Sequence, residues 1–120
     1  MLIRSQDKRM IVNFDNICTV SAFPEKDSED IYVEDGTGSL MVGRYSTKAK
    51  AMKVLNMIQK SYMDFEVSKI ISTGLAGAAF IRRYDTPENV AAGIKVLKDY
   101  VELIRESVVF QIPEDGSVEV

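Results

Sequence analysis

VGRYSTKAKAMKVLNMI, residues 42–58, contains the point at which the pattern of the sequence changes. Up to Tyr45 the chain consists of short runs rich in Ile, Val, Phe, Tyr and Met between turn-forming residues, which is typical of strands in an antiparallel sheet. From Ser46 the apolar residues recur at steps of three and four, and Ser46 or Thr47 can serve as N-cap, which indicates a helix. We therefore predict an α+β fold in which the sheet precedes the helices.

The N-terminal part, residues 1–45, is predicted to form about five short strands. Asp35-Gly36 predicts a hairpin turn, because glycine takes positive φ without a steric penalty. Cys18 is expected to be a small apolar residue in a strand. The expected strands are Leu2–Arg4, Met10–Phe14, Ile17–Phe23, Ile31–Glu34 and Leu40–Tyr45.

Residues 46–106 are predicted to form two long helices. The first is expected to run at least to Tyr62, and the glycines in residues 73–78 are expected to break or loosen any continuation. The second begins at Thr86-Pro87-Glu88, where Thr86 caps the helix and Pro87 occupies its first position. Its apolar face comprises Val90, Ile94, Leu97, Val101 and Ile104. Residues 107–120 are expected to form a short strand and an exposed tail of one domain that spans residues 1–120.

The composition removes several classes of site. Cys18 is the single cysteine of the 120 residues and histidine is absent, which excludes intramolecular disulfides, thiolate clusters and catalytic pairs that need histidine. We therefore expect a binding protein rather than an enzyme, without cofactor or metal. No run resembles a signal peptide or a membrane span, so we expect a cytoplasmic protein without membrane contact.

Charge is divided along the chain. Residues 24–36 contain six acids and one lysine, a balance of −5, whereas residues 44–83 contain eight cations and two acids, a balance of +6. The second segment is expected to attract anions. Binding to duplex nucleic acid is not expected, because the formal net charge of the chain is −3.

Phe80-Ile81-Arg82-Arg83-Tyr84 joins aromatic rings to adjacent guanidinium groups just before a predicted helix N-terminus. Arginine binds phosphate bidentately, rings stack on bases, and the helix terminus adds N–H donors, so these residues could form a nucleotide site. The alternative is that the rings belong to the core and the arginines form a solvated face. Arg44 and Arg105 are the next candidates for ligand contact.

Self-association is expected as well, because two long amphipathic helices offer more apolar surface than one small sheet can obviously cover. A monomer in which both helices fold back onto the sheet is the alternative.

Several stretches resemble a group of short proteins from low-GC Gram-positive bacteria and their phages, and residues 62–106 resemble the phage anti-Thoeris proteins. The stretches are Ile3–Lys8, Val42–Lys48, Ala51–Leu55, Ile58–Gln59 and Val109–Glu114. The resemblance implies a sheet followed by two long helices, assembled as dimers or higher oligomers in the cytoplasm of an infected or lysogenic host. It also implies that the protein sequesters a cyclic ADP-ribose isomer without degrading it. By the same resemblance, the ligand contacts between protomers are expected at Phe80, Arg82, Arg83 and Asn89.

Two other functions compete with this one. The acidic residues 25–35 could bind a host defence complex directly, which would make the chain a protein-binding inhibitor. A metal-dependent hydrolase is the third class, although no carboxylate pair has recognisable metal-ligand spacing.

Overall fold

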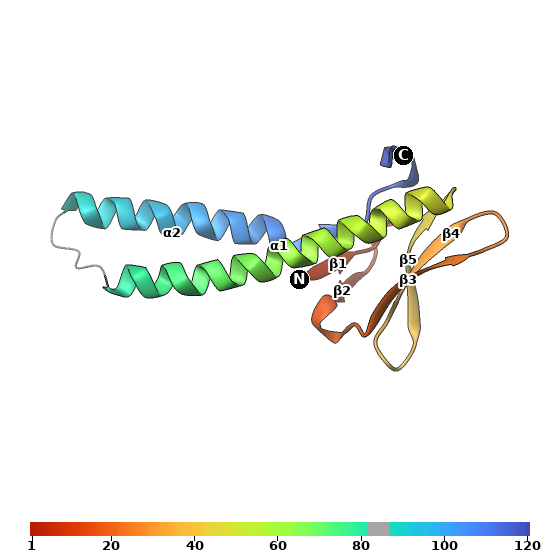
Figure 1. The fold of residues 1–120 in the computed structure, drawn as a ribbon, viewed down its shortest axis with the longest axis horizontal. Helices are drawn as coiled ribbons and strands as arrows, with labels where there is room; N and C mark the ends of the chain where they lie inside the picture. The colour runs from red at the N-terminus through yellow and green to blue at the C-terminus, as the bar shows by residue number, and fades with distance from the viewer. Residues whose placement is uncertain (82–86) are drawn as a thin grey trace. The chain divides into compact units, whose positions relative to one another are not determined.

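The structure, a computed structural model, describes residues 1–81 and 87–120, apart from the side chains of Ser72 and of residues 75–81, and it confirms the predicted α+β class (Figure 1). The described chain divides into two compact units, residues 1–62 with 109–120 and residues 63–108. The elements are β1 (Leu2–Arg4), β2 (Ile11–Asn13), the 3-10 turn η1 (Phe14–Asn16), β3 (Thr19–Pro24), β4 (Glu29–Glu34), β5 (Ser39–Tyr45), α1 (Lys48–Ile81), α2 (Pro87–Val108), β6 (Val109–Gln111) and the 3-10 turn η2 (Asp115–Ser117).

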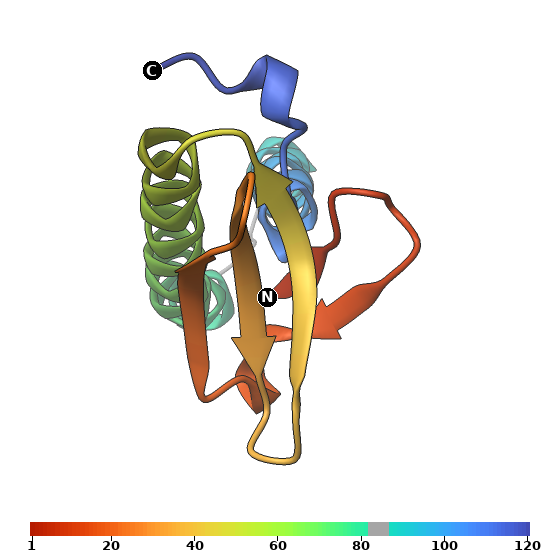
Figure 2. The same ribbon diagram turned by 90° about the vertical axis from the view of Figure 1, so that its right-hand side faces the viewer.

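Within the described residues, the strands of the first unit form two three-stranded sheets (Figure 2). In the sheet β2-β1-β6, Ile3 lies opposite Val12 of the antiparallel neighbour and opposite Phe110 of the parallel neighbour. In the sheet β3-β4-β5 both pairs are antiparallel, and the ladder between β4 and β5 has a bulge next to Ile31 and Tyr32. The five predicted strands are thus distributed over two sheets.

The buried apolar residues of the first unit recur at every second position on β4 and at every third or fourth position on α1. Ile31 and Val33, two residues apart on β4, are buried on one side of the sheet, as alternation requires. Ala51, Val54 and Ile58 recur at helical spacing on α1 and are buried as well. Other buried apolar residues are Met1, Ile3, Val42, Tyr45, Ile112 and Val118.

Helix α1 begins as predicted and ends later than predicted. The Thr47 hydroxyl accepts a hydrogen bond from the Lys50 N–H at 3.3 Å, which makes Thr47 the N-cap. The expected break at residues 73–78 is wrong, because α1 continues to Ile81. A helical glycine is less favourable than alanine by only about 1 kcal/mol, too little to end a helix of 34 residues at Gly74.

The C-terminal segment differs from the exposed tail that was expected. The Tyr45 hydroxyl donates a hydrogen bond to the Pro113 carbonyl at 2.7 Å, and the Gln6 amide donates to the same carbonyl at 3.1 Å. The Asp115 carboxylate accepts from the Ser46 N–H at 2.8 Å and from the Lys50 ammonium at 3.1 Å. These contacts hold the C-terminal segment against residues 1–62 of the first unit.

Cys18 also differs from its prediction. It precedes β3, lies outside the strand and is exposed.

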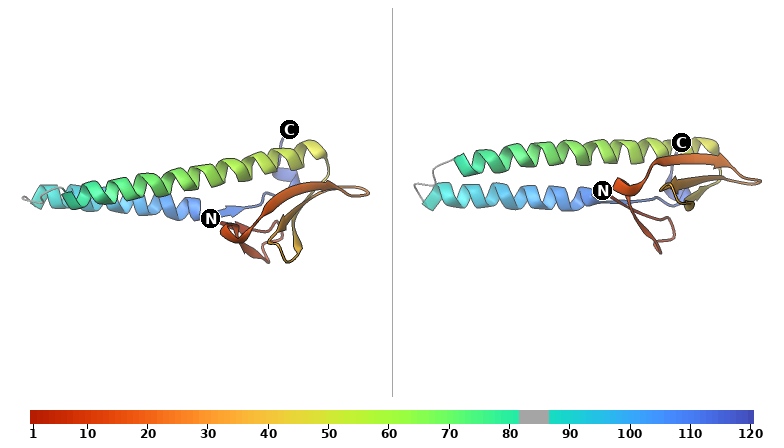
Figure 3. Two further views of the ribbon diagram at one scale, coloured as in Figure 1. Left: turned by 60° about the horizontal axis from the view of Figure 1, so that its bottom comes forward. Right: turned by 90° about the horizontal axis from the view of Figure 1, so that it is seen from below.

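In the second unit, the later part of α1 and the whole of α2 run side by side in opposite directions (Figure 3). The Tyr100 hydroxyl donates a hydrogen bond to the Ser68 carbonyl and joins the two helices. None of the described residues of α2 is buried. The helix pair therefore lacks a closed core of its own among the described residues.

We predict that Tyr45→Phe lowers the free energy of unfolding by about 1 to 2 kcal/mol, because it removes a hydrogen bond from a fully buried hydroxyl. Urea unfolding followed by circular dichroism measures the change. Tyr62→Phe is the matched control, since the Tyr62 ring stacks on Phe14 at 4.8 Å and keeps that contact; it should change stability by less than about 0.5 kcal/mol. Equal effects of the two substitutions would contradict the assignment.

Candidate functional site

The predicted nucleotide segment is only partly within the described residues. Phe80 belongs to α1, but its side chain, together with Arg82 and Arg83, lies outside them. Asn89 lies in the first turn of α2 and is exposed. Helix α2 begins at Pro87, as predicted, so Arg82 and Arg83 lie five and four residues before its first residue in the sequence.

Arg105 lies in the last turn of α2, where its guanidinium is 3.4 Å from the Glu102 carboxylate. Along the helix axis Arg105 is about 24 Å from Asn89, because an α-helix rises 1.5 Å per residue. One compact cyclic nucleotide cannot contact both residues of the same helix. If both bind ligand, they must belong to different sites or to different copies of the chain.

Arg44, the remaining candidate, is held by an ion pair. It lies on β5, and its Nη2 and Nε atoms donate to the carboxylate of Asp30 on β4 at 2.8 Å and 3.0 Å. Asp30 is completely buried, and the Ser28 hydroxyl donates to it at 2.9 Å. The Arg44 hydrogen bonds hold the pKa of Asp30 below its ordinary value, with a smaller contribution from Ser28. Arg44 thus has a structural partner, and its contact with a ligand stays a prediction.

The apolar face predicted on α2 is exposed in the structure. Val90, Ile94, Leu97 and Val101 retain between 38% and 50% of their accessible surface. With Ile104 and Val108 they follow alternating steps of four and three, the heptad spacing of a helix that packs along another helix. We call these six residues the α2 seam. On α1, Met63, Val67, Ile70 and Ile71 are exposed as well.

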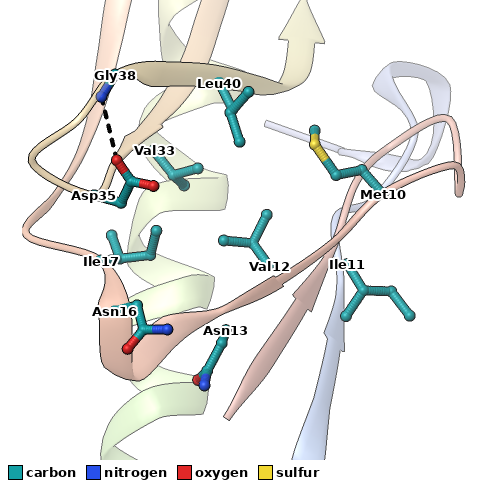
Figure 4. A pocket seen from close by; sticks show the side chains of 10 residues that line it. All are labelled: Met10, Ile11, Val12, Asn13, Asn16, Ile17, Val33, Asp35, Gly38 and Leu40. Atoms are coloured by element: carbon teal, nitrogen blue, oxygen red, sulfur yellow. Dashed lines mark hydrogen bonds between the residues drawn. The ribbon is translucent and has the colours of Figure 1, made fainter.

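A hollow of about 210 Å³ lies in the first unit between β2, η1 and the β4–β5 turn (Figure 4). Val12, Ile17, Val33 and Leu40 line its apolar part. Asp35 also lines it, but the Asp35 Oδ1 atom accepts hydrogen bonds from the hydroxyl and N–H of Thr37 and from the Gly38 N–H, which stabilise the turn and lower the Asp35 pKa. The hollow can accept a small apolar group; of its polar side chains, Asp35 serves the β4–β5 turn and Asn13 accepts a hydrogen bond from the Asp15 N–H at the start of η1.

The acidic residues 25–35 have several structural roles. Glu25 accepts a hydrogen bond from the Tyr32 hydroxyl at 3.4 Å, and Glu34 accepts one from the Thr19 hydroxyl at 3.1 Å. Asp30 accepts hydrogen bonds from Arg44, and Asp35 accepts hydrogen bonds from Thr37 and Gly38. Among the described residues, no group of three or more cysteine and carboxylate side chains could hold a metal ion.

Sequence reasoning missed Asp30 as the partner of Arg44. Alternation along β4 places Asp30 on the side opposite Ile31, which predicts a solvent-facing carboxylate. Only the register, in which Asp30 lies between Phe23 and Arg44, shows what covers it.

Comparison of the chain with protein-family models, curated proteins and solved structures gave no significant match. No helix within the described ranges is both long and apolar enough to cross a membrane.

We predict that Arg44→Gln lowers the melting temperature, because it leaves the Asp30 carboxylate buried without its counter-charge. Adding Asp30→Asn should recover part of the loss, since a neutral amide is easier to bury than an unpaired carboxylate. Thermal melting measures both effects, with Arg9→Gln as an exposed control. A double variant that melts no higher than Arg44→Gln would contradict the role of the pair.

Acid should remove the same contribution. Folding lowers the Asp30 pKa, so the stabilisation is present above the ordinary carboxyl pKa and is lost as the pH falls through the folded-state pKa. The melting temperature of the unmodified chain should therefore fall more steeply below about pH 4 than that of the double variant.

Proposed function

We propose that this chain is a homo-oligomeric binding protein without catalytic activity, which sequesters a cyclic nucleotide signal such as a cyclic ADP-ribose isomer and so counters a bacterial anti-phage defence. The observation that carries the proposal is the α2 seam, in which Val90, Ile94, Leu97 and Val101 are exposed while Ile104 and Val108 are half-buried. Large apolar side chains in a continuous heptad need a second helix to cover them. Helix α1 of the same chain runs beside α2 but leaves Val90, Ile94, Leu97 and Val101 between 38% and 50% exposed, so the covering helix in this proposal is α2 of a second copy.

The spacing of the seam fits an antiparallel pair of α2 helices. If the two copies are centred on Asp99, Val90 lies opposite Val108 of the second copy, Ile94 opposite Ile104, and Leu97 opposite Val101. Each seam residue then lies opposite a seam residue of the second copy. In every layer, an a position of one helix packs against a d position of the other. The arrangement is two-fold symmetric and closes as a dimer.

This pairing also resolves the separation of Asn89 and Arg105. In the antiparallel dimer, Arg105 of one copy lies beside Ala91 of the other, within one turn of Asn89 and of the helix N-terminus that follows Arg82 and Arg83. Each dimer then has two equivalent sites, and each site draws on both copies. Guanidinium groups and the helix N-terminus neutralise the phosphates, and the Phe80 ring offers a stacking surface for the base.

Sequestration needs charge neutralisation and stacking but no group that transfers protons. The sequence contains no histidine, and the candidate residues are arginine, phenylalanine and asparagine, none of which is suited to acid-base chemistry near neutral pH. Capture of an intact ligand is the activity expected of such a site. The resemblance to anti-Thoeris proteins supports the same proposal.

We predict that Leu97→Glu raises the dimer dissociation constant at least about 100-fold, because it buries two carboxylates at the centre of the seam. Native mass spectrometry and sedimentation velocity measure the distribution of oligomers. Val120→Glu is the control, because Val120 is exposed and lies outside α2. A variant that assembles as the unmodified chain does would remove the seam from the interface.

We predict that the protein binds a cyclic ADP-ribose isomer and returns it unchanged after denaturation, as measured by chromatography with mass spectrometry. Arg82→Ala and Arg83→Ala should each weaken binding by about one to two decades, as expected for loss of a charge-assisted bond to phosphate. Arg9→Ala is the control. Recovery of cleaved ligand would contradict sequestration.

Mixing variants tests whether the two copies share each site. Arg82→Ala/Arg83→Ala and Arg105→Ala should each bind weakly alone. After exchange of subunits, half of the dimers are mixed and one of their two sites is intact, so about one quarter of the full capacity should return. Calorimetric titration counts the sites. No recovery, in samples shown to have exchanged subunits, would place each site within one copy.

A further inference from the structure

The sheet β3-β4-β5 has a second, exposed face opposite the core. Phe23 and Met41 on this face retain 50% and 42% of their accessible surface. Strand register places Ser21, Tyr32 and Met41 in one row and Phe23, Asp30 and Arg44 in the next. We call the surface formed by Phe23, Tyr32, Met41 and Arg44, with Glu25 and Glu34 beside them, the outer face.

Contacts within the outer face hold its side chains in place. The rings of Phe23 and Tyr32 meet edge to face at 6.2 Å, and the Tyr32 hydroxyl donates to Glu25. The Arg44 Nη2 atom lies 3.7 Å from the Met41 sulfur. The buried Asp30 carboxylate accepts hydrogen bonds from Nε and Nη2 of Arg44 and so holds the guanidinium in place. These side chains are preorganised, so a partner would lose less conformational entropy on docking.

The fold does not require this composition. Ile31 and Val33 already fill the core side of β4, and polar residues would suit the solvent side of an antiparallel sheet. Tyrosine, phenylalanine, methionine and arginine are instead the residues enriched in protein interfaces. An ordered cluster of them on an exposed face marks a contact surface.

Charge identifies the kind of partner. From Thr19 to Tyr45 the chain contains six acidic residues and two basic ones, a balance of −4. Arg44 is neutralised by Asp30, so Glu25 and Glu34 are left as the charges that flank the aromatic pair. Such a surface repels the phosphates of nucleic acid and attracts lysine and arginine, which can also stack on the rings.

We propose that the outer face is a docking surface for a basic segment of a partner protein. Apolar or aromatic side chains of the segment cover Phe23 and Met41, and its lysine or arginine side chains meet Glu25 and Glu34. All these residues lie in the first unit, in a different part of the sequence from the proposed nucleotide residues. The two activities are therefore separable by substitution.

A random library of 12-residue peptides displayed on phage, selected against the immobilised protein, tests the proposal. Enriched peptides should carry at least two lysine or arginine residues next to an aromatic or aliphatic residue. Their affinity, measured by fluorescence anisotropy, should fall at least about tenfold for Phe23→Ser/Met41→Ser and for Glu25→Gln/Glu34→Gln, and should fall with added salt.

Leu40→Ser is the matched control, because Leu40 adjoins Met41, retains 47% of its accessible surface and lines the hollow instead of the outer face. It should leave peptide binding unchanged, as should Arg82→Ala/Arg83→Ala, which separates this proposal from the nucleotide site. Circular dichroism confirms that each variant is folded.

Three results would overturn the proposal. Enriched peptides without basic residues, or with equal affinity for Phe23→Ser/Met41→Ser, would exclude a basic partner at this face. Binding of poly(U) RNA that this variant loses would assign the face to nucleic acid. A smaller oligomer in this variant alone, without peptide, would show that a second copy covers the face.

Discussion

The parallel pairing of β1 with β6 is the contact on which the architecture of the chain depends, because it joins the two ends of the sequence. Ile112 extends the pairing by donating its N–H to the Arg4 carbonyl at 3.0 Å. Parallel strands need a crossover connection, and here it contains both long helices. The outgoing and returning helices must therefore match in length. Residues 63–81 extend about 28 Å and the 22 residues of α2 about 33 Å.

Local signals in the sequence predicted the elements, and non-local contacts decided what was missed. The Asp35-Gly36 turn, the Thr47 cap and the Pro87 start depend on neighbouring residues, and all three occur in the structure. The docked C-terminus depends on contacts between Asp115 and residues more than 60 positions earlier. Glu-Asp-Gly-Ser is typical of a solvated tail, so its composition did not predict that role. The continuation of α1 past Gly74 shows that a weak local preference does not end a long helix.

The candidate site was predictable in its residue types but not in its geometry. Adjacent arginines beside aromatic rings indicated anion binding, and the heptad of α2 was visible as an apolar face. The partner of Arg44 could not be predicted from the sequence, because Asp30 and Arg44 become neighbours only through the register of β4 and β5. No pattern in the sequence predicted the outer face either. Phe23, Tyr32 and Met41 belong to three different strands, and a bulge between β4 and β5 affects which residues lie side by side. The apolar residues of the α2 face were visible in the sequence, and the structure leaves Val90, Ile94, Leu97 and Val101 exposed in the single chain, so the self-association expected from them stays a prediction.

The contrast between the two units has a thermodynamic consequence for the proposed function. The first unit buries its own apolar residues, whereas α2 buries none of its described residues and, in the proposed dimer, would gain a core by association. If each ligand contacts two copies, ligand binding and dimerisation are linked, and each strengthens the other. Ligand at 100 times its dissociation constant stabilises the bound state by about 2.7 kcal/mol per site. The protein would then hold its dimer most firmly when the signal is abundant, the condition in which a sequestering protein is needed.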